Sequence, residues 1–225
     1  MSKADNFQNK LDKAYGIVAK NLGRSFEIYR PASLDNPLQS SNYIDEKLVS
    51  FSKDEKYKSV SKSGLSLWLT WIDASLDNLF TLKNGDMFYD SQNNETYITV
   101  GMEPLLTHQS IKANNRISIT RSGSTGYGDN DGTGFAPGNI ATSSTIATNV
   151  PCQILQASSY GTAGYVPTTS NAEDTIPRLE IYLWDSNNEI NIRDKFTDEN
   201  GIEMEVQVIT QTDVGTKILA RGIPQ

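Results

Sequence analysis

The sequence lacks most features that would assign it quickly to a functional class. Its only cysteine is Cys152, which excludes an intrachain disulfide, and its only histidine is His108. No Gly-x-Ser-x-Gly elbow and no Gly-x-x-x-x-Gly-Lys-Ser/Thr phosphate loop occurs. We therefore expect no enzyme activity and no catalytic, cofactor-binding or metal site.

Long apolar runs and an excess of positive charge are also missing. No 18-residue apolar stretch occurs and no apolar run follows the N-terminus, so we expect neither a membrane span nor a signal peptide, and synthesis in a cytoplasm. The net charge of -7 argues against sequence-specific binding of nucleic acid, which draws its affinity from clustered Lys and Arg.

An internal repeat dominates what is present. Its five anchor residues are Asp86, Phe88, Asp90, Glu95 and Val100, which recur 108 residues later, without a gap, as Asp194, Phe196, Asp198, Glu203 and Val208. Each copy reads as a short strand, an acidic turn and an alternating strand, which is the pattern of a β-hairpin. Because the aspartates occur in both copies, we interpret them as turn-forming rather than as a cation site.

Alternating apolar residues predict further strands at 65–72, 116–120, 151–155, 179–184 and 216–221. Residues 26–30 form a brief extended segment, and residues 43–52 fit a strand or a poor helix. The fold class is therefore mainly β, with a β-barrel or sandwich built from two related hairpin units, an N-terminal amphipathic helix and long polar loops.

The N-terminal helix is predicted over residues 5–22, with Gly23 ending it. Its apolar stripe consists of Phe7, Leu11, Ala14, Tyr15, Val18 and Leu22. We expect this stripe to dock on the protein's own core, or alternatively on a neighbouring subunit.

The predicted organisation has four segments that pack as one domain. Residues 1–64 form the helix and an extended arm, 65–120 the first β-unit, 121–176 a loop region with one short strand, and 177–225 the second β-unit. In 121–149, 15 of the 29 residues are Gly, Ser or Thr, so we expect a loop that is mobile in the free subunit and orders on assembly.

Three isolated features have ordinary interpretations. Asp129-Asn130-Asp131-Gly132 looks like a calcium loop but lacks the bidentate Glu six residues after the glycine, so a flexible loop is favoured. His108 is interpreted as a bystander in a polar segment. Cys152 lies in an apolar strand and is expected to act as a small buried hydrophobe.

The hairpin units resemble small β-barrel virion proteins from the head-tail junction of tailed bacteriophages and prophages. The resemblance rests on residues 83–90 with Tyr97-Ile98-Thr99-Val100, and on residues 192–201. Residues 103–106 through 114–119, and a helix followed by Ile28-Tyr29-Arg30-Pro31, resemble stretches of the same class.

The resemblance implies a virion protein that forms a six- or twelve-fold ring as a neck, connector or collar through which DNA passes. Its partners would be copies of itself and adjacent portal, neck or tail proteins, and it would assemble in the host bacterial cytoplasm. The duplication departs from simple head-closure proteins, which are single barrels, so tail terminator and baseplate adaptor remain alternative stations.

A carbohydrate- or receptor-binding β-module is the alternative from another class. It is suggested by aromatic residues in and beside the polar loops, namely Trp68, Tyr127, Tyr160, Tyr165 and Trp184. Because both faces of the strands that carry Trp68 and Trp184 are partly apolar, packing on two sides is the competing interpretation.

Overall fold

The computed structural model describes residues 3–53, 65, 67–73, 81–101, 107–124, 141–156, 178–185 and 187–223. The elements in chain order are α1 (Lys3–Leu22), β1 (Arg24–Tyr29), the 3-10 helix η1 (Ser40–Asn42), β2 (Tyr43–Lys53), β3 (Leu67–Ile72), β4 (Met87–Asp90), β5 (Glu95–Gly101), β6 (His108–Lys112), β7 (Asn115–Ser124), β8 (Ala141–Gln156), β9 (Arg178–Leu183), β10 (Lys195–Asp198), β11 (Glu203–Thr212) and β12 (Gly215–Gly222).

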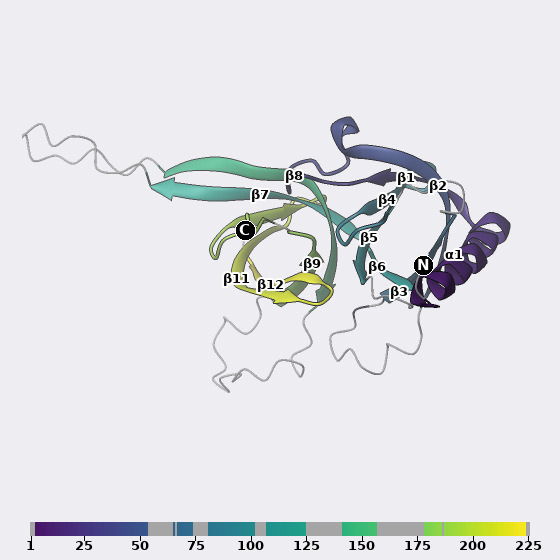
Figure 1. Cartoon of the computed structure of the whole chain (residues 1–225). Helices are drawn as coiled ribbons and strands as arrows, with labels where there is room; N and C mark the ends of the chain where they lie inside the picture. Colours follow the sequence, from purple (N-terminus) through teal and green to yellow (C-terminus); the bar gives the residue numbers. More distant parts are fainter. Residues whose placement is uncertain are drawn as a thin grey trace, which may run out of the picture.

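The strands form two closed six-stranded antiparallel barrels that stand side by side (Figure 1). The first barrel runs β1-β2-β3-β6-β5-β4, and the second, started at β7, runs β7-β8-β9-β12-β11-β10. Adding six to each strand number of the first barrel gives the second. The mainly β fold with an N-terminal helix is thus confirmed, and the repeat extends over a whole barrel rather than a hairpin.

Strand register shows that the two barrels are equivalent residue by residue. Ile28 pairs with Phe88 where the first barrel closes, and Ile119 pairs with Phe196 where the second does. A β-bulge follows Thr99 on β5, and another follows Val206 on β11. These shared irregularities identify positions that correspond in space.

The predicted ungapped repeat is wrong by one residue after the turn. Phe88 faces Tyr97, but Phe196 faces Met204, because the second turn is one residue shorter. The outgoing strands therefore correspond at an offset of 107 rather than 108 residues. Since side chains alternate between faces, a shift of one residue changes which of them point inward.

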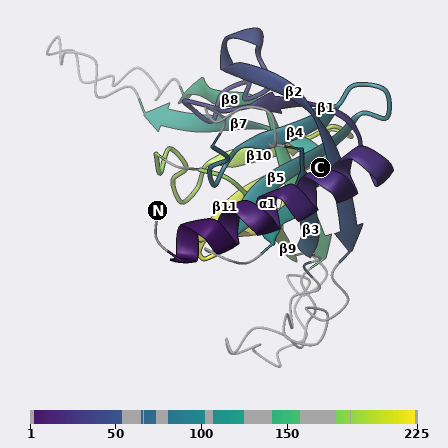
Figure 2. The ribbon, with the colours of Figure 1, turned by 45° about the vertical axis from the view of Figure 1, so that its right-hand side comes forward.

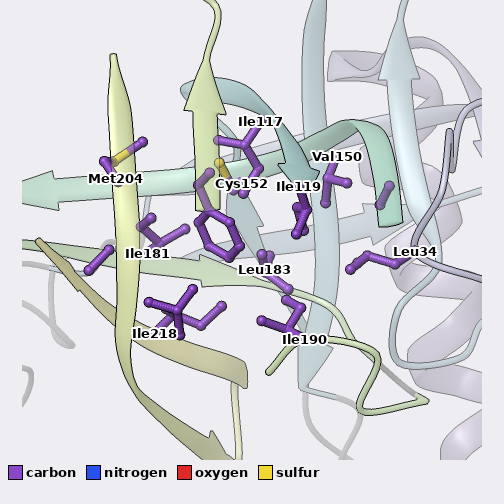
Figure 3. Close-up of a cluster of buried hydrophobic side chains, with 14 residues drawn as sticks. Leu34, Ile117, Ile119, Val150, Cys152, Ile181, Leu183, Ile190, Met204 and Ile218 are labelled. Atoms are coloured by element: carbon purple, nitrogen blue, oxygen red, sulfur yellow. The ribbon is translucent and has the colours of Figure 1, made fainter. Parts of the chain in front are cut away.

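Both barrels have packed interiors. The second is filled by aliphatic side chains together with Phe196, and Leu34, from the segment after β1, completes it (Figure 3). The first contains more aromatic residues, with Phe26, Phe88 and Tyr97 buried beside Ile28, Val49 and Ile72. Equivalent positions are therefore filled with differently shaped side chains, as close packing allows when total volume is kept.

An Arg–Asp clamp occurs once in each barrel. Arg30 donates from Nε and Nη2 to the two oxygens of Asp86 (2.8 and 2.7 Å), and Nη2 also reaches the Thr81 carbonyl. Arg121 holds Asp194 in the same way (2.8 and 2.8 Å). Both aspartates are almost fully buried. Each clamp joins the end of the barrel's first strand to the start of its repeated hairpin.

A third apolar cluster lies between the barrels. The outer faces of β3 to β6 contribute Leu67, Met87, Ile98, Val100 and Ile111, and β9 contributes Tyr182 with Trp184 just beyond it. This contact explains why five consecutive residues of β5, from Thr96 to Val100, are all buried. One face of β5 points into its own barrel and the other packs toward the second barrel.

The helix α1 crosses the outside of the first barrel and contacts β2 and β3 (Figure 2). It ends where predicted, since the Gly23 amide donates to the Ala19 carbonyl. The predicted docking face is wrong in part, because Gly16 and Ala19 are buried whereas Phe7 and Leu22 are 52% and 75% exposed. Small residues let the helix approach the strands closely and leave larger ones in solvent.

Several predicted boundaries differ from the barrels. Residues 24–53, assigned to an extended arm, supply β1 and β2 of the first barrel. The predicted loop 121–149 contains the end of β7 and the first half of β8, and the short strand at 151–155 belongs to the 16-residue β8. Residues 125–140 and 157–176 of the predicted loop region lie outside the described residues.

The contact between Gly85 and Trp184 gives a test of how the barrels pack. Gly85 has φ +89°, and a Cβ there would lie 2.1 Å from Trp184 Nε1. Gly201 has φ +78° with open space around it. We expect Gly85→Ala to lower the free energy of unfolding by roughly 2–4 kcal/mol, from left-handed strain plus overpacking, and Gly201→Ala by only about 1–2 kcal/mol, from strain alone.

Urea unfolding of the two variants measures the difference. Equal losses would mean that the indole of Trp184 moves away at little cost, and that the barrels do not pack tightly at this point. The equivalent of Gly85 in the second barrel is Arg193, with φ +74°, so a side chain is accommodated there.

Candidate functional site

The interiors of the two barrels differ in polarity at one end. Thr70, Thr99 and Ser110 are fully buried in the first barrel, and Thr70 shares a 2.8 Å hydrogen bond with Ser110. His108 lies opposite Thr70 on β6. By register, the equivalents in the second barrel are all apolar, namely Ile181, Val206, Ala220 and Ile218. At these four positions the interior of the first barrel is polar and that of the second is apolar.

A pocket of about 310 Å³ opens at the other end of the first barrel. We call it the mouth pocket; it is lined by Leu22, Arg24, Phe26, Val49, Ser50, Phe51, Trp68, Glu95, Tyr97 and Lys112. Phe51 and Tyr97 stack at 3.7 Å, and Trp68 meets Tyr97 edge-on at 5.7 Å. The pocket therefore has an aromatic wall.

Charged side chains form its rim. Arg24 bridges Asp90 and Glu95, with nitrogen-oxygen distances of 3.0 Å to each. Lys112 donates to the other oxygen of Glu95, and its Nζ lies 5.5 Å from the Tyr97 ring centre and 5.8 Å from that of Trp68. The two cations balance the two carboxylates, so the rim presents both donors and acceptors without net charge.

The second barrel keeps the carboxylate of Asp90 as Asp198 but lacks the aromatic and cationic groups at the equivalent positions. Register places Asn115 where Arg24 stands, Leu179 where Trp68 stands, Met204 for Tyr97 and Gly222 for Lys112. The barrel closes equally well without them. Barrel formation therefore does not by itself require an aromatic, charged mouth.

The outer faces of the barrels also differ. On the first barrel, one row across four paired strands is buried against the second barrel; this apolar row is Met87, Ile98, Ile111 and Leu67. The equivalent charged row on the second barrel is Lys195, Glu205, Arg221 and Arg178. We do not expect a third barrel to dock on the charged row as the second docks on the first, because three cations would be buried with Glu205 as the one carboxylate of the row.

Each barrel has a pair of like charges that lie directly opposite each other on neighbouring strands. Arg178 lies directly opposite Arg221, and Glu27 on β1 lies directly opposite Glu46 on β2. Like charges in this position destabilise a sheet. No ion pair neutralises any of the four within the part of the chain that the structure describes; Glu27 accepts a hydrogen bond from Tyr29, and Glu46 one from Ser25.

Of the repeated aspartates, Asp90 and Asp198 have the predicted turn-forming role, whereas Asp86 and Asp194 chiefly pair with arginines. Asp90 accepts from the amides of Gln92 and Asn93, and Asp198 from those of Asn200 and Ile202. Asp86 and Asp194 are held in the clamps, whose arginines the sequence did not single out. No group of three His, Cys, Asp or Glu side chains suited to a metal ion occurs among the described residues.

The other sequence candidates are scattered. Cys152 is buried in β8 as predicted, and its burial raises the pKa of the thiol. Burial lowers the pKa of His108, whose Nδ1 has no hydrogen-bond partner among the described residues. Trp68 lines the mouth pocket, whereas Trp184 packs over Gly85 between the barrels. Residues 129–132, Tyr127, Tyr160 and Tyr165 lie outside the described residues.

Within the described residues, no helix is both long and apolar enough to span a membrane. No protein-family model, curated protein or solved structure matches this chain. Its function therefore has to be inferred from the residues and their geometry.

The rim of the mouth pocket predicts a pH dependence. The hydrogen bond from Lys112, assisted by the one from Arg24, lowers the pKa of Glu95 below its ordinary 4.5 despite partial burial. A depressed carboxyl pKa stabilises the fold above the unfolded-state pKa, and this contribution is lost as the pH falls through the folded-state pKa. Lys112→Met should raise the pKa of Glu95 and reduce the loss of stability on acidification.

Carbon-detected NMR titration measures the pKa of Glu95 in both proteins. Asp45 is the internal control, because its own pKa is lowered chiefly by Lys47 and should not respond to Lys112→Met. A Glu95 pKa that is the same in both proteins would contradict the interpretation.

Proposed function

We propose that this protein is a structural subunit that assembles with copies of itself into a ring, at the head-tail junction of a tailed-phage particle as neck, connector or collar. The observation that carries the assembly is the pair of unneutralised like-charged positions, basic on the second barrel and acidic on the first. The position in a phage particle is inferred from the resemblance of the hairpin units to virion proteins of the head-tail junction. A tail or baseplate adaptor could assemble through the same contact.

A contact between the basic pair of one copy and the acidic pair of the next would relieve both repulsions. Glu46 and Arg178 are exposed, and Glu27 and Arg221 are half-buried, so all four are within reach of a partner. Apolar side chains accompany each pair. Tyr43 and Leu48 flank Glu46 on β2 and are 46% and 38% exposed, and Val208 on β11 is 47% exposed.

Such a contact joins two different surfaces and is therefore heterologous. Heterologous contacts propagate until the rotation between subunits closes a ring, or they produce an open helix when it does not close. The charged row prevents the uncontrolled extension that a second apolar row would permit. Charge complementarity at the contact also favours the correct partner and speeds association.

A projecting ribbon gives a second means of reaching a neighbour. We define it as Arg121–Ser124 paired with Ala141–Ser144, which extends beyond the second barrel (Figure 1). Neighbouring strands pair with β7 only up to Thr120 and with β8 only from Gln153. Apart from Arg121, which Asp194 holds, the ribbon consists of small residues. A two-stranded ribbon of this kind gains little stability alone, so we expect an adjacent subunit to support it.

Charge reversal tests the contact. We expect Arg178→Glu/Arg221→Glu and Glu27→Lys/Glu46→Lys each to block self-association, because each places like charges on both contacting surfaces. An equimolar mixture should associate again, since the intact surface of each variant fits the other. Light scattering at low ionic strength measures the mass against the 24.8 kDa monomer.

The matched control for Arg178→Glu/Arg221→Glu is Lys10→Glu/Lys13→Glu, which lowers the net charge by the same amount on exposed positions of α1. This variant should associate like the parent protein. Failure of the mixture to associate, or equal loss in the control, would contradict the proposed contact. Mass spectrometry of particles from a phage or prophage encoding the chain tests separately whether the protein is part of the virion.

A further inference from the structure

The mouth pocket places charged side chains beside aromatic rings at the edge of the first barrel's core. It has an aromatic wall of Phe51, Trp68 and Tyr97, and a rim in which Arg24, Glu95 and Lys112 remain partly exposed. The side chain of Arg24 is 51% exposed and that of Lys112 is 33% exposed. Polar groups are thus presented to the pocket opening beside aromatic rings.

We propose that the mouth pocket binds a neutral sugar ring. Tyr97 is buried and stacks on Phe51, so the ring offered to a ligand is that of half-buried Trp68. Its electron-rich face attracts the weakly positive C–H groups of a pyranose face. Sugar hydroxyls donate and accept at adjacent positions, and the rim offers the guanidinium and ammonium as donors next to the Glu95 carboxylate as acceptor. The proposal concerns a ligand of the single subunit and does not depend on ring assembly.

The balanced charges of the rim favour a neutral ligand over an anionic one. Asp90 and Glu95 cancel the charges of Arg24 and Lys112, so a phosphate or carboxylate ligand would have to displace a carboxylate that is already paired. A neutral polyhydroxylated ligand can bond to the outward-facing N–H and oxygen atoms without breaking these pairs. A volume of about 310 Å³ suits one or two sugar units rather than a long chain.

The second barrel provides a control within the same molecule. Its equivalent positions hold Leu179 for Trp68 and Gly222 for Lys112, so it offers neither a ring nor a charge. The second barrel closes without them, so barrel closure in general does not require an aromatic ring and a lysine at these positions. Their restriction to one barrel fits a binding site on a duplicated scaffold, where function lies in the side chains and not in the fold.

The probes are glucose, galactose, mannose and N-acetylglucosamine, with their disaccharides, tested by saturation-transfer NMR and calorimetry on the full chain. We expect at least one to bind with a Kd on the order of 1 mM or tighter. Trp68→Leu and Lys112→Gly, which install the residues of the second barrel, should each weaken binding about tenfold or more, corresponding to the loss of one good contact.

Leu179→Ala is the matched control in the second barrel and should leave the Kd unchanged. Thermal unfolding of each variant identifies those that remain folded, and Lys112→Met serves if the glycine variant does not. No saturation transfer from any probe at about 20 mM would overturn the proposal. Equal binding by Trp68→Leu, or binding of glucose 6-phosphate in preference to glucose, would overturn it as well. None of these results bears on the charge-reversal test of assembly.

Discussion

The two barrels depend on a bidentate arginine–aspartate clamp. In the first barrel only three residue pairs join β1 to β4, and in the second only four join β7 to β10, so the closing seam is short in both. Arg30 and Arg121 bind the buried Asp86 and Asp194 next to these short pairings. The two carboxylates also accept hydrogen bonds from the backbone amides of Lys83 and Asn191. Each buried carboxylate is fully paired, and it would be costly to bury without its arginine.

With closure secured at the seam, the remaining positions were free to diverge. The first barrel has a polar interior at one end, an aromatic mouth at the other, and an apolar row that the second barrel covers. The second barrel has an aliphatic interior and a charged row at the same place. One scaffold therefore supplies an internal interface in its first copy and an exposed charged face in its second.

The sequence predicted the hairpins well, because Asp and Asn turns and alternating residues are local signals. It did not predict closure, since closure of the first barrel requires β1 to pair with β4, which lies far along the chain. The first half of β8 was not predicted because its Thr, Ser and Ala residues give no alternating apolar pattern. This part of the strand pairs only with β7 among the described strands.

The mouth pocket and the charged row could not be predicted from the sequence. Trp68 was identified as an aromatic candidate, but its neighbours Tyr97 and Lys112 join it only through the pairing of β3, β5 and β6. Arg178 and Arg221 lie 43 positions apart and become a like-charged pair only in the register of β9 and β12. The second turn is one residue shorter than the first, so the residues that correspond in the outgoing strands could not be identified from the ungapped repeat.

Sedimentation velocity of the unaltered protein over a range of concentrations, at low and at high salt, shows whether the protein self-associates through its charged pairs. The account predicts a mass that rises above 24.8 kDa with concentration and falls again when salt screens the contact between the basic and acidic pairs. A protein that stays monomeric at every concentration and ionic strength would contradict it, and the like-charged pairs would then need another partner.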